Sequence, residues 1–392
     1  MAKRSTTTAT PRLRFPEFRN QAGFEPTPLG RAFRRITNGK ANAQDHEEGG
    51  AFPLFDRSEV IKASSKFAFD AVAVILPGEG MSFRPRYFEG KFDLHQRAYA
   101  LMQCQGQGKY FYYALDRMKA DLALKAVKST VLSLRLPIIE KFVVFAPSNN
   151  AEQQKIADCL TSLDEVIDAQ GRKVEALKAH KRGLMQQLFP REGETRPRLR
   201  FPEFRDAPDW SNRLLGEAAT FYNGRAYAKE ELLERGKYRV LRVGNFFTND
   251  HWYYSDLELE DSKYCDDGDL LYAWSASFGP RMWHGGKTIY HYHIWKVVEN
   301  KKIDRAFLFY RLSSETEQMR AKAANGIGMF HITKGTIENW ASSFPEIGEQ
   351  QRIADCLSSL DTQITAETNQ LAALKTHKQG LMQQLFPAPE SD

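Results

Sequence analysis

The sequence is poor in cysteine and contains no long apolar run. Its 392 residues include only 4 cysteines, too few for a disulfide framework, so we expect a reducing, cytoplasmic environment. The longest run of aliphatic residues is the segment 71–76, whereas a membrane-spanning helix needs roughly 20 apolar residues. The basic, threonine-rich start, residues 1–10, is not followed by the apolar stretch of a secretory signal. We therefore expect a protein that has no membrane partner.

Signatures of catalysis are also missing. Residues 285–288 spell Gly-Gly-Lys-Thr, but Arg281 stands where a phosphate-binding loop needs its first glycine. The chain has no Pro-Pro pair, so it lacks the Asn/Asp-Pro-Pro-Tyr/Phe motif of an amino-methyltransferase, and it has no Gly-x-Ser-x-Gly elbow. A zinc site could be drawn only from residues without the usual metal-ligand spacing, namely Cys265, His284, His291 and His293. We expect no catalytic residues, no metal and no cofactor in this chain.

The net charge excludes few classes of protein, because basic and acidic residues are nearly equal in number. The chain is 42% hydrophobic and 27% charged, which excludes a fibrous or wholly disordered protein. The net charge of +6 permits a nucleic-acid partner without requiring one. Residues 20–150 carry 18 basic against 13 acidic residues, or +5, and residues 206–348 carry 18 against 20, or −2. If the second segment binds DNA, its basic side chains must therefore cluster away from the acidic run 256–269.

The most informative feature of the sequence is internal repetition. The segment Pro-Arg-Leu-Arg-Phe-Pro-Glu-Phe-Arg at 11–19 recurs unchanged at 197–205, and residues 152–190 recur at 349–387 with 26 of 39 positions identical. The two segments between these repeats are unlike. They share only short matches near their starts, Leu29-Gly30 with Leu215-Gly216 and Asn38-Gly39 with Asn223-Gly224. At roughly 150 residues per domain, the length predicts two or three domains.

The repeats predict a plan in which constant and variable segments alternate. Its parts are an N-terminal constant segment (1–19), a first variable domain (20–150), a constant helix (151–190), a linker with the short repeat (191–205), a second variable domain (206–348), a second constant helix (349–387) and a tail (388–392). Each variable segment is large enough to bury its own core. Within them, residue patterns predict α/β domains with strands at 69–76, 141–145, 238–243, 269–273 and 289–298, helices at 109–119 and 305–322, and turns at 77–80, 279–280 and 285–286.

The long repeat has the heptad pattern of a coiled coil, with apolar residues at alternating steps of four and three. Pro190 and Pro387 end the two helices. Polar residues interrupt the stripe at matching places, Gln170 with Glu367 and Lys181 with Lys378, and Cys159 and Cys356 lie beside it as apolar filler. About 39 residues of helix span roughly 58 Å. We assign the following residues to the seam: Ile156, Leu160, Leu163, Ile167, Val174, Leu177, Leu184 and Leu188 in the first copy, and Ile353, Leu357, Leu360, Ile364, Leu371, Leu374, Leu381 and Leu385 in the second.

The variable segments are rich in planar, polar and basic side chains set among aromatic residues. Arginine pairs with guanine and Asn or Gln with adenine, whereas Ser and Lys anchor phosphates. For any one such residue, a solvated surface role is at least as good an explanation. The residues that we predict to contact nucleic acid are Arg84, Arg86, His95, Gln96, Arg97, Gln105 and Lys109 in the first segment, and Asn223, Arg225, Ser275, Ser277, Arg281, His284 and Lys287 in the second.

Together these motifs resemble the specificity subunits of type I restriction-modification systems. The resemblance is carried by the two Pro-Arg-Leu-Arg-Phe-Pro-Glu-Phe segments and the two Glu-Gln-Gln-Lys/Arg-Ile-Ala-Asp-Cys-Leu openings. It extends to the Gly-Leu-Met-Gln-Gln-Leu-Phe-Pro tails and to the run Gly268-Asp-Leu-Leu-Tyr-Ala-Trp-Ser275. It covers nearly the whole chain. The first domain departs from the pattern at its start, which lacks the tryptophan found at Trp210.

The resemblance implies a prokaryotic subunit with no catalytic activity of its own. In that family each variable segment recognises one half of a split site in double-stranded DNA, and the two long helices pair antiparallel as a spacer. The subunit docks two modification subunits, which bind S-adenosylmethionine and methylate adenine, and restriction subunits, which use ATP and Mg²⁺. The implied fold is thus two α/β target-recognition domains, separated by an antiparallel coiled coil and related by a pseudo-twofold internal duplication.

Two other functions are compatible with the sequence. The chain is a scaffold if its coiled coil joins two proteins without touching DNA, and deletion of 20–150 and 206–348 would then leave its role intact. It is the remnant of a fused methyltransferase-endonuclease if the isolated chain binds S-adenosylmethionine, although the missing Pro-Pro motif weighs against this.

Overall fold

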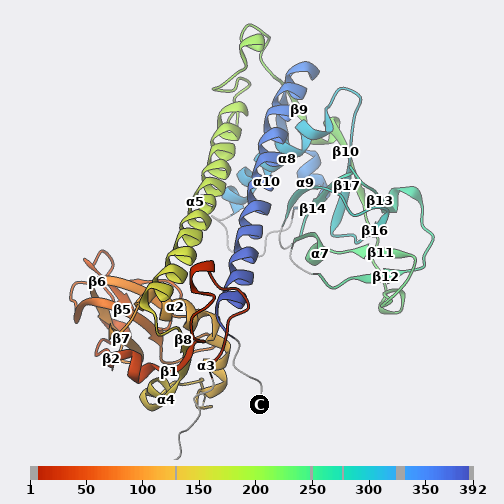
Figure 1. Ribbon diagram of the computed structural model, residues 1–392. Helices are drawn as coiled ribbons and strands as arrows, with labels where there is room; N and C mark the ends of the chain where they lie inside the picture. Colours follow the sequence, from red (N-terminus) through yellow and green to blue (C-terminus); the bar gives the residue numbers. More distant parts are fainter. Residues whose placement is uncertain (1–7, 129, 248–249, 276–277, 324–331, 388–392) are drawn as a thin grey trace, which may run out of the picture. The chain divides into compact units, whose positions relative to one another are not determined.

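A computed structural model describes residues 8–128, 130–247, 250–275, 278–323 and 332–387 of the chain, so the predicted tail 388–392 lies outside the described residues. Two compact units are present, one made of residues 1–171 and 369–392 and the other of residues 172–368. Each unit contains a globular α/β part and pieces of the two long helices, α5 (Asn150–Leu188) and α10 (Ile347–Leu385) (Figure 1). No helix in the described ranges is long and apolar enough to cross a membrane.

The first globular part is built on a six-stranded sheet. Its order is β2 (Phe33–Asn38), β7 (Ala98–Cys104), β5 (Phe69–Pro77), β6 (Arg86–Leu94), β3 (Phe52–Phe55) and β4 (Lys62–Ser64). Neighbouring strands are antiparallel except β3 and β6, which are parallel. The remaining elements are the strand pair β1 (Glu25–Pro28) with β8 (Val143–Ala146) and the helices α1 (Leu29–Ala32), α2 (Gly108–Arg117), α3 (Lys119–Lys125) and α4 (Leu136–Lys141).

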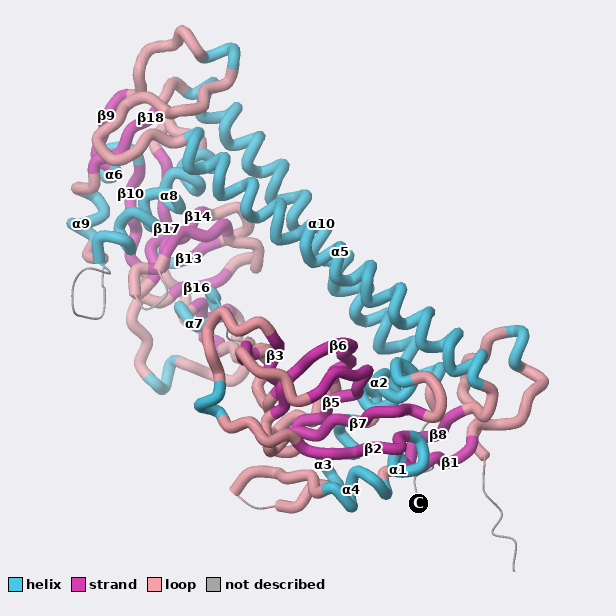
Figure 2. The backbone as a smooth tube through the Cα atoms, turned by 90° about the vertical axis from the view of Figure 1, so that its left-hand side faces the viewer, coloured by secondary structure: helices cyan, strands magenta, loops and turns pink. Residues whose placement is uncertain are grey.

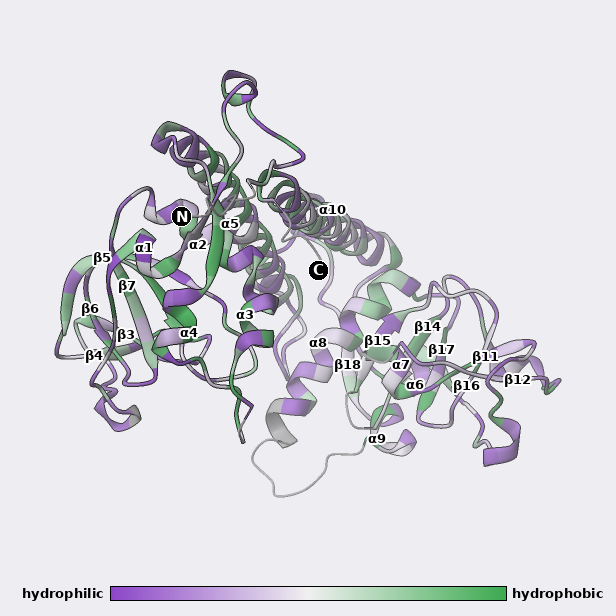
Figure 3. Ribbon diagram, turned by 60° about the horizontal axis from the view of Figure 1, so that its bottom comes forward, coloured by the Kyte–Doolittle hydropathy of each residue, from purple (hydrophilic) through white to green (hydrophobic). Residues whose placement is uncertain are grey.

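The second globular part has two four-stranded sheets. One has the order β10 (Ala219–Asn223), β17 (Ile294–Glu299), β14 (Leu270–Ala273) and β15 (Gly279–Met282), and the other β12 (Tyr253–Ser255), β11 (Tyr238–Leu241), β16 (Thr288–Tyr290) and β13 (Tyr264–Cys265). Strand β9 (Ser211–Leu214) pairs with β18 (Ala341–Phe344), and the helices are α6 (Leu215–Ala218), α7 (Val243–Phe247), α8 (Arg305–Ala323) and α9 (Lys334–Glu338). Hydrophobic residues gather on the strands of each globular part (Figure 3).

The predicted elements are largely confirmed, with two errors. Strand β5 and helices α2 and α8 lie where the sequence predicts them. The single strand predicted over 289–298 is wrong, since β16 and β17 are separated by a turn at 291–293. The predicted turn at 279–280 is the start of β15, where Gly279 has a φ of +145°. β15 is an edge strand, a position where a sheet tolerates proline.

Predicted strand ends are also shifted where a helix adjoins. Helix α4 runs to Lys141, so the strand predicted from that residue begins at Val143. Strand β11 ends at Leu241 because α7 begins at Val243. The predicted strand at 269–273 starts one residue later, as β14.

The two long helices pack in each unit with opposite ends together. In the first unit, Ile156 and Leu160 near the start of α5 share a core with Leu385 at the end of α10 (Figure 2). In the second unit, Leu188 at the end of α5 shares a core with Ile353 and Leu357 near the start of α10. Every predicted seam residue is buried or half-buried. The heptad prediction of two long helices with one apolar stripe each is confirmed, although each helix begins and ends one or two residues before the predicted bounds of 151–190 and 349–387.

The short repeats attach to the long helices by the same contacts in both units. The guanidinium of Arg14 forms a buried ion pair with Glu152 at 2.7 Å, and Arg200 pairs with Glu349 at 2.7 Å. The Leu13 amide donates to the carbonyl of Gln384 at 3.0 Å, and the Leu199 amide to that of Gln187 at 2.9 Å, which adds a partner at the end of each helix. Each copy of the repeat thus ties the first turn of one helix to the last turns of the other.

The lysines that interrupt the apolar stripe make polar contacts across the helix pair. Lys181 Nζ lies 2.6 Å from Asp361 Oδ1, and Lys378 Nζ lies 2.5 Å from Asp164 Oδ1. The same carboxylates accept hydrogen bonds from a tyrosine of the globular part, Tyr310 OH to Asp361 at 2.7 Å and Tyr113 OH to Asp164 at 2.8 Å. Burial raises the pKa of both phenols, so they remain donors at neutral pH. The polar breaks in the stripe therefore fix the register of the helices.

We expect replacement of Leu160 by alanine to destabilise the first unit by about 2–5 kcal/mol, because the fully buried side chain leaves a cavity. The matched control is Leu124→Ala, since Leu124 is 81% exposed on α3 of the same unit. Its effect should stay within about 0.5 kcal/mol. Chemical unfolding followed by circular dichroism measures both, and equal shifts of the two midpoints would contradict the assignment of Leu160 to the core.

Candidate nucleic-acid interface

Two of the predicted arginines lie together at the start of β6. Arg84 and Arg86, together with Arg57, line a cavity of about 330 Å³. Its walls also include the aromatic rings of Tyr87 and Tyr112. Arg86 donates from Nη2 to the carbonyls of Ser58 and Glu59, each at 2.6 Å, and thereby holds the loop between β3 and β4. Arg84 is exposed. Arg86 thus shapes the rim of a basic, aromatic hollow, whereas Arg84 presents its charge to solvent.

Lys109 belongs to the same neighbourhood. Its Nζ lies 5.5 Å from the ring centre of Tyr87, a cation–π contact that places a third predicted cation beside the arginines. Gln105 is exposed just before α2, and its amide donates weakly to the carbonyl of Gln103 at 3.4 Å. The structure therefore brings Arg84, Arg86 and Lys109 together around one tyrosine.

The other predicted residues of the first domain lie in the turn between β6 and β7. Gln96 donates to Asn42 Oδ1 at 2.8 Å, and Arg97 forms an exposed ion pair with Glu79 at 2.7 Å. His95 is half-buried, and its Nδ1 accepts a hydrogen bond from the Arg97 amide at 3.1 Å. The ion pair offsets the charge of Arg97, so Gln96 and His95 are the polar groups that this turn offers to a ligand.

The predicted residues of the second domain are dispersed. Lys287 is exposed, with its Nζ 4.5 Å from the ring centre of Tyr264, and Arg281 donates to the carbonyl of Phe246. Arg225 forms an ion pair with Glu231 at 2.7 Å, which raises the pKa of the guanidinium. Asn223 and His284 are exposed, Ser275 is buried, and Ser277 lies outside the described residues.

A basic and aromatic cluster that the sequence did not reveal lies on β11 and β12 and on the residues next to them. The guanidinium of Arg239 stacks over Trp252 at 5.1 Å, and that of Arg242 stacks over Tyr253 at 4.2 Å. These contacts arise because β11 pairs with β12, opposing Arg239 to Tyr254. No local spacing in the sequence signals them. Side chains of this kind stack on bases or neutralise phosphates in nucleic-acid interfaces.

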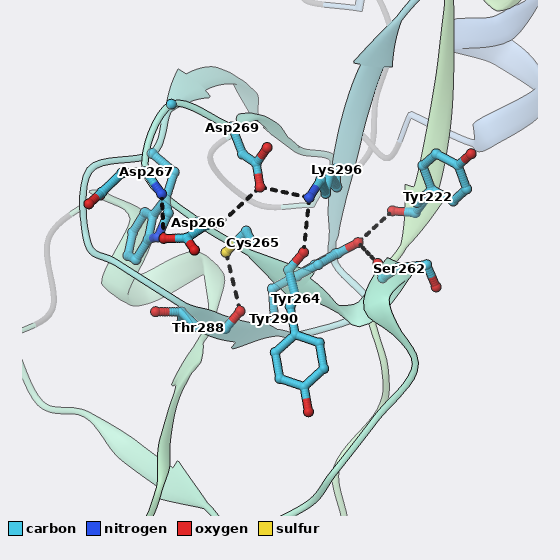
Figure 4. Close-up of polar contacts among 12 residues, drawn as sticks. Tyr222, Ser262, Tyr264, Cys265, Asp266, Asp267, Asp269, Thr288, Tyr290 and Lys296 are labelled. Atoms are coloured by element: carbon cyan, nitrogen blue, oxygen red, sulfur yellow. Dashed lines mark hydrogen bonds and ion pairs between the residues drawn. The ribbon is translucent and has the colours of Figure 1, made fainter.

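The acidic run of the second domain is largely used internally. Asp269 forms an ion pair with Lys296 at 2.7 Å (Figure 4). Asp267 accepts the Gly286 amide at 2.9 Å. Asp256 accepts the Lys237 amide at 2.7 Å, and Glu258 pairs with the Lys237 ammonium group. These acidic side chains are therefore committed to contacts within the domain.

The same view shows why Cys265 has a structural role. Its Sγ donates to the carbonyl of Thr288 at 3.5 Å, and burial raises the pKa of the thiol (Figure 4). Tyr290 donates to the carbonyls of Tyr222 and Ser262 at 3.3 and 2.5 Å, which ties β16 to its neighbours. Over the described part of the chain, no three His, Cys, Asp or Glu side chains are grouped as ligands for a metal ion.

The turn at 291–293 packs imidazoles and phenols together. The rings of His291 and His293 have centres 4.9 Å apart, and Tyr292 and His293 have centres 4.0 Å apart. Burial, together with smaller effects of the nearby His293 and Arg242, lowers the pKa of His291 to about 4. His291 is therefore neutral at physiological pH.

The chain is similar to DNA specificity subunits of type I restriction systems. Residues 208–376 match the model of the type I restriction modification DNA specificity domain. The chain is similar to the type I restriction enzyme MjaVIII specificity subunit of Methanocaldococcus jannaschii, with 24% identity over 299 residues that cover 71% of this chain and 69% of the relative. It is also similar to the EcoDI specificity subunit of Escherichia coli, with 27% identity over 143 residues, or 36% of this chain and 32% of the relative.

Two solved structures share the fold. The crystal structure of the S subunit of a type I restriction-modification system from M. genitalium has a TM-score of 0.65 at 17% identity, covering 97% of this chain and 100% of that one. A chain from a structural study of the assembly and conformational transition of a type I system has a TM-score of 0.57 at 14% identity, covering 94% and 98%. Both likenesses extend over nearly the full described fold.

We expect His291 to make stability depend on pH. Its pKa is lower in the folded state than the 6.5 of a free imidazole, so the unfolded chain binds more protons between pH 6.5 and about 4. The stabilisation is fully present above pH 6.5 and is lost as pH falls through that window. In His291→Gln, the fall of the urea midpoint between pH 6.5 and 4 should be smaller than in the parent, whereas His284→Gln, at an exposed position, should leave it unchanged. If the urea midpoint falls by the same amount in His291→Gln and His284→Gln, His291 does not cause the pH dependence.

Proposed function

The chain belongs to the family of specificity subunits of type I restriction-modification systems, and from this premise we propose that it recognises a two-part DNA target with one half for each globular domain. The observation that carries the proposal is that two domains with unlike surfaces are attached to one pair of helices by matching contacts. Arg14–Glu152 and Tyr113–Asp164 in the first unit correspond to Arg200–Glu349 and Tyr310–Asp361 in the second. Like attachments and unlike surfaces suit a pseudo-twofold protein on a duplex, whose backbone is itself twofold-symmetric.

The unlike surfaces supply different chemistry to the two half-sites. The first domain offers Arg84 and Lys109 beside Tyr87, and the second offers Arg239 and Lys287 beside aromatic rings. Arginine contacts to base edges give sequence discrimination, and lysine contacts to phosphates give affinity. Different bases are therefore expected in the two halves.

We further propose that the helices act as a spacer and as docking surfaces for partner subunits. A 39-residue helix spans roughly 58 Å, or about 17 base pairs at 3.4 Å each. The repeated sequences of α5 and α10 offer two similar surfaces, which suits two copies of one modification subunit. Methylation with S-adenosylmethionine and ATP- and Mg²⁺-dependent cleavage then belong to the modification and restriction subunits, and this chain contributes DNA recognition without catalysis.

The proposal is tested by selecting bound duplexes from a random pool with the chain reconstituted with its modification subunits. We expect a motif of two short conserved halves separated by a gap of constant length. Arg84→Gln should relax discrimination in one half and Arg239→Gln in the other, each by about 1–3 kcal/mol per base contact. A scaffold would return no motif, and a single uninterrupted motif would contradict two-domain recognition.

Inserting seven residues into both long helices should lengthen the gap. One heptad adds about 10 Å, which corresponds to roughly three base pairs. Inserting the heptad preserves the apolar stripe and the polar cross-contacts, whereas a four-residue insertion is the control that shifts the stripe and should impair folding. The same selection measures the gap, and a gap unchanged by the heptad insertion would show that the helices do not set it.

A further inference from the structure

The turn between β6 and β7 in the first domain is held by a distinctive set of hydrogen bonds. The His95 amide donates to the Phe55 carbonyl at 2.9 Å, and the Ala98 amide donates back to the His95 carbonyl at 3.0 Å. The Arg97 amide donates to Nδ1 of the His95 ring at 3.1 Å. Both the main chain and the imidazole of His95 therefore define the turn.

The turn between β16 and β17 in the second domain repeats these bonds around His291. The His291 amide donates to the Leu241 carbonyl at 2.9 Å, the Ile294 amide to the His291 carbonyl at 2.9 Å, and the His293 amide to His291 Nδ1 at 3.5 Å. The segment that packs beside each turn, around residue 41 in the first domain and residue 225 in the second, is bonded in the same way. The Tyr292 amide donates to the carbonyl of Arg225 at 3.0 Å, as the Gln96 amide does to that of Ala41 at 2.9 Å.

A glycine allows the neighbouring segment to approach each turn. A Cβ atom at Gly39 would lie 1.7 Å from the Leu94 carbonyl oxygen, and one at Gly224 would lie 2.4 Å from that of His291. Only glycine fits so close to another backbone. The sequence match Asn38-Gly39 with Asn223-Gly224 is thus one part of a histidine-centred turn that two otherwise unlike domains share.

The hydrogen bonding of the imidazoles determines what they can offer a ligand. Because Nδ1 accepts a main-chain hydrogen bond in both turns, a neutral ring carries its proton on Nε2. Burial lowers the pKa of both His95 and His291, which favours the neutral ring. Both side chains are only half-buried, and Nε2 has no protein partner among the described residues. Each turn therefore presents one N–H donor that is free for a ligand.

Basic side chains lie near both imidazoles. Arg57, Lys62 and Arg97 lie close enough to His95 to disfavour its protonation, and Arg242 does the same to His291. The acidic neighbour of His95 is Asp56, which is paired with Lys62 at 2.7 Å. An anion placed at Nε2–H would therefore meet a hydrogen-bond donor near Arg57 in the first turn and near Arg242 in the second.

We propose that His95 and His291 donate from Nε2 to a DNA phosphate, one in each half-site, and that this common contact positions both domains on the duplex. The inference rests on the proposed DNA-reading function and deepens it. Two domains that read different bases share this turn, and the part of the target that is the same in both halves is the backbone. Base recognition is left to the groups that differ, such as Arg84 and Arg239.

The test compares two nearly isosteric substitutions at each position, in the full chain with its modification subunits. The side-chain oxygen of Asn or Asp can accept the amide two residues on, so His95→Asn, His95→Asp, His291→Asn and His291→Asp all retain the turn. Asn keeps an N–H donor, whereas Asp places a negative charge against the phosphate. We expect each Asp variant to bind at least about tenfold more weakly than the matching Asn variant, both to the selected duplex and to a scrambled one.

The DNA side of the contact is tested with the unaltered chain. Single phosphates of the selected duplex are replaced by uncharged methylphosphonates, and in each half one position should weaken binding by the parent. At that position the difference between the Asp and Asn variants should shrink to less than about threefold, since the repulsion is removed. Because a neutral imidazole displaces no counterion, His291→Asn should also leave the salt dependence of binding unchanged.

Three results would overturn the inference. Equal DNA affinities of the Asp and Asn variants would show that no phosphate lies at the turn. A loss of affinity confined to the selected duplex would indicate base recognition. If no methylphosphonate substitution narrows the difference in affinity between the Asp and Asn variants, a phosphate partner is excluded. In each case the selected motif would still stand, whereas failure to select any motif with the parent chain would refute the proposed function itself.

Discussion

One carboxylate on each long helix, Asp164 on α5 and Asp361 on α10, joins three parts of the protein. Each accepts a lysine from the opposite helix and a phenol from a helix of the globular part. A partly buried charge is tolerated only where such partners replace water. Losing either partner would leave the carboxylate poorly compensated. The register of the helices and the attachment of the domain are therefore coupled through a single side chain.

This coupling explains why the leucine-rich apolar stripe of each long helix contains a lysine. An uninterrupted apolar stripe can slide by a heptad at little cost, because leucine packs equally well on leucine. Lys181 and Lys378 have an acidic partner only in the observed register. The apolar residues supply the stability of the helix pair, and the lysine–aspartate contacts select one alignment of it. In the spacer role proposed above, alignment of the helices would matter as much as their stability.

Local periodicity was sufficient to predict the helices, the apolar stripe and the polar interruptions. It could not identify Asp361 as the partner of Lys181, because 180 positions separate them in the chain. The error at 291–293 has a similar cause. The alternation of the segment favours a continuous strand, but the His291 imidazole accepts a main-chain amide and closes a turn. Among the candidate contact residues, chemistry singled out Arg84 and Lys109, but only the fold brings them together at Tyr87.

Net charge is a poor guide to the second domain for a related reason. Its acidic residues outnumber its basic ones, yet Asp269 and Glu258 are paired with lysines, and Asp267 is engaged by a main-chain amide. Arg239 and Arg242 instead lie over aromatic rings, which leaves their charge uncompensated by a carboxylate in these contacts. What a phosphate backbone meets is the local field of unpaired cations and oriented N–H groups, and not the sum over the domain. Net charges of opposite sign therefore do not prevent both domains from offering cations and N–H donors to the same polyanion, even though their surfaces differ in other respects.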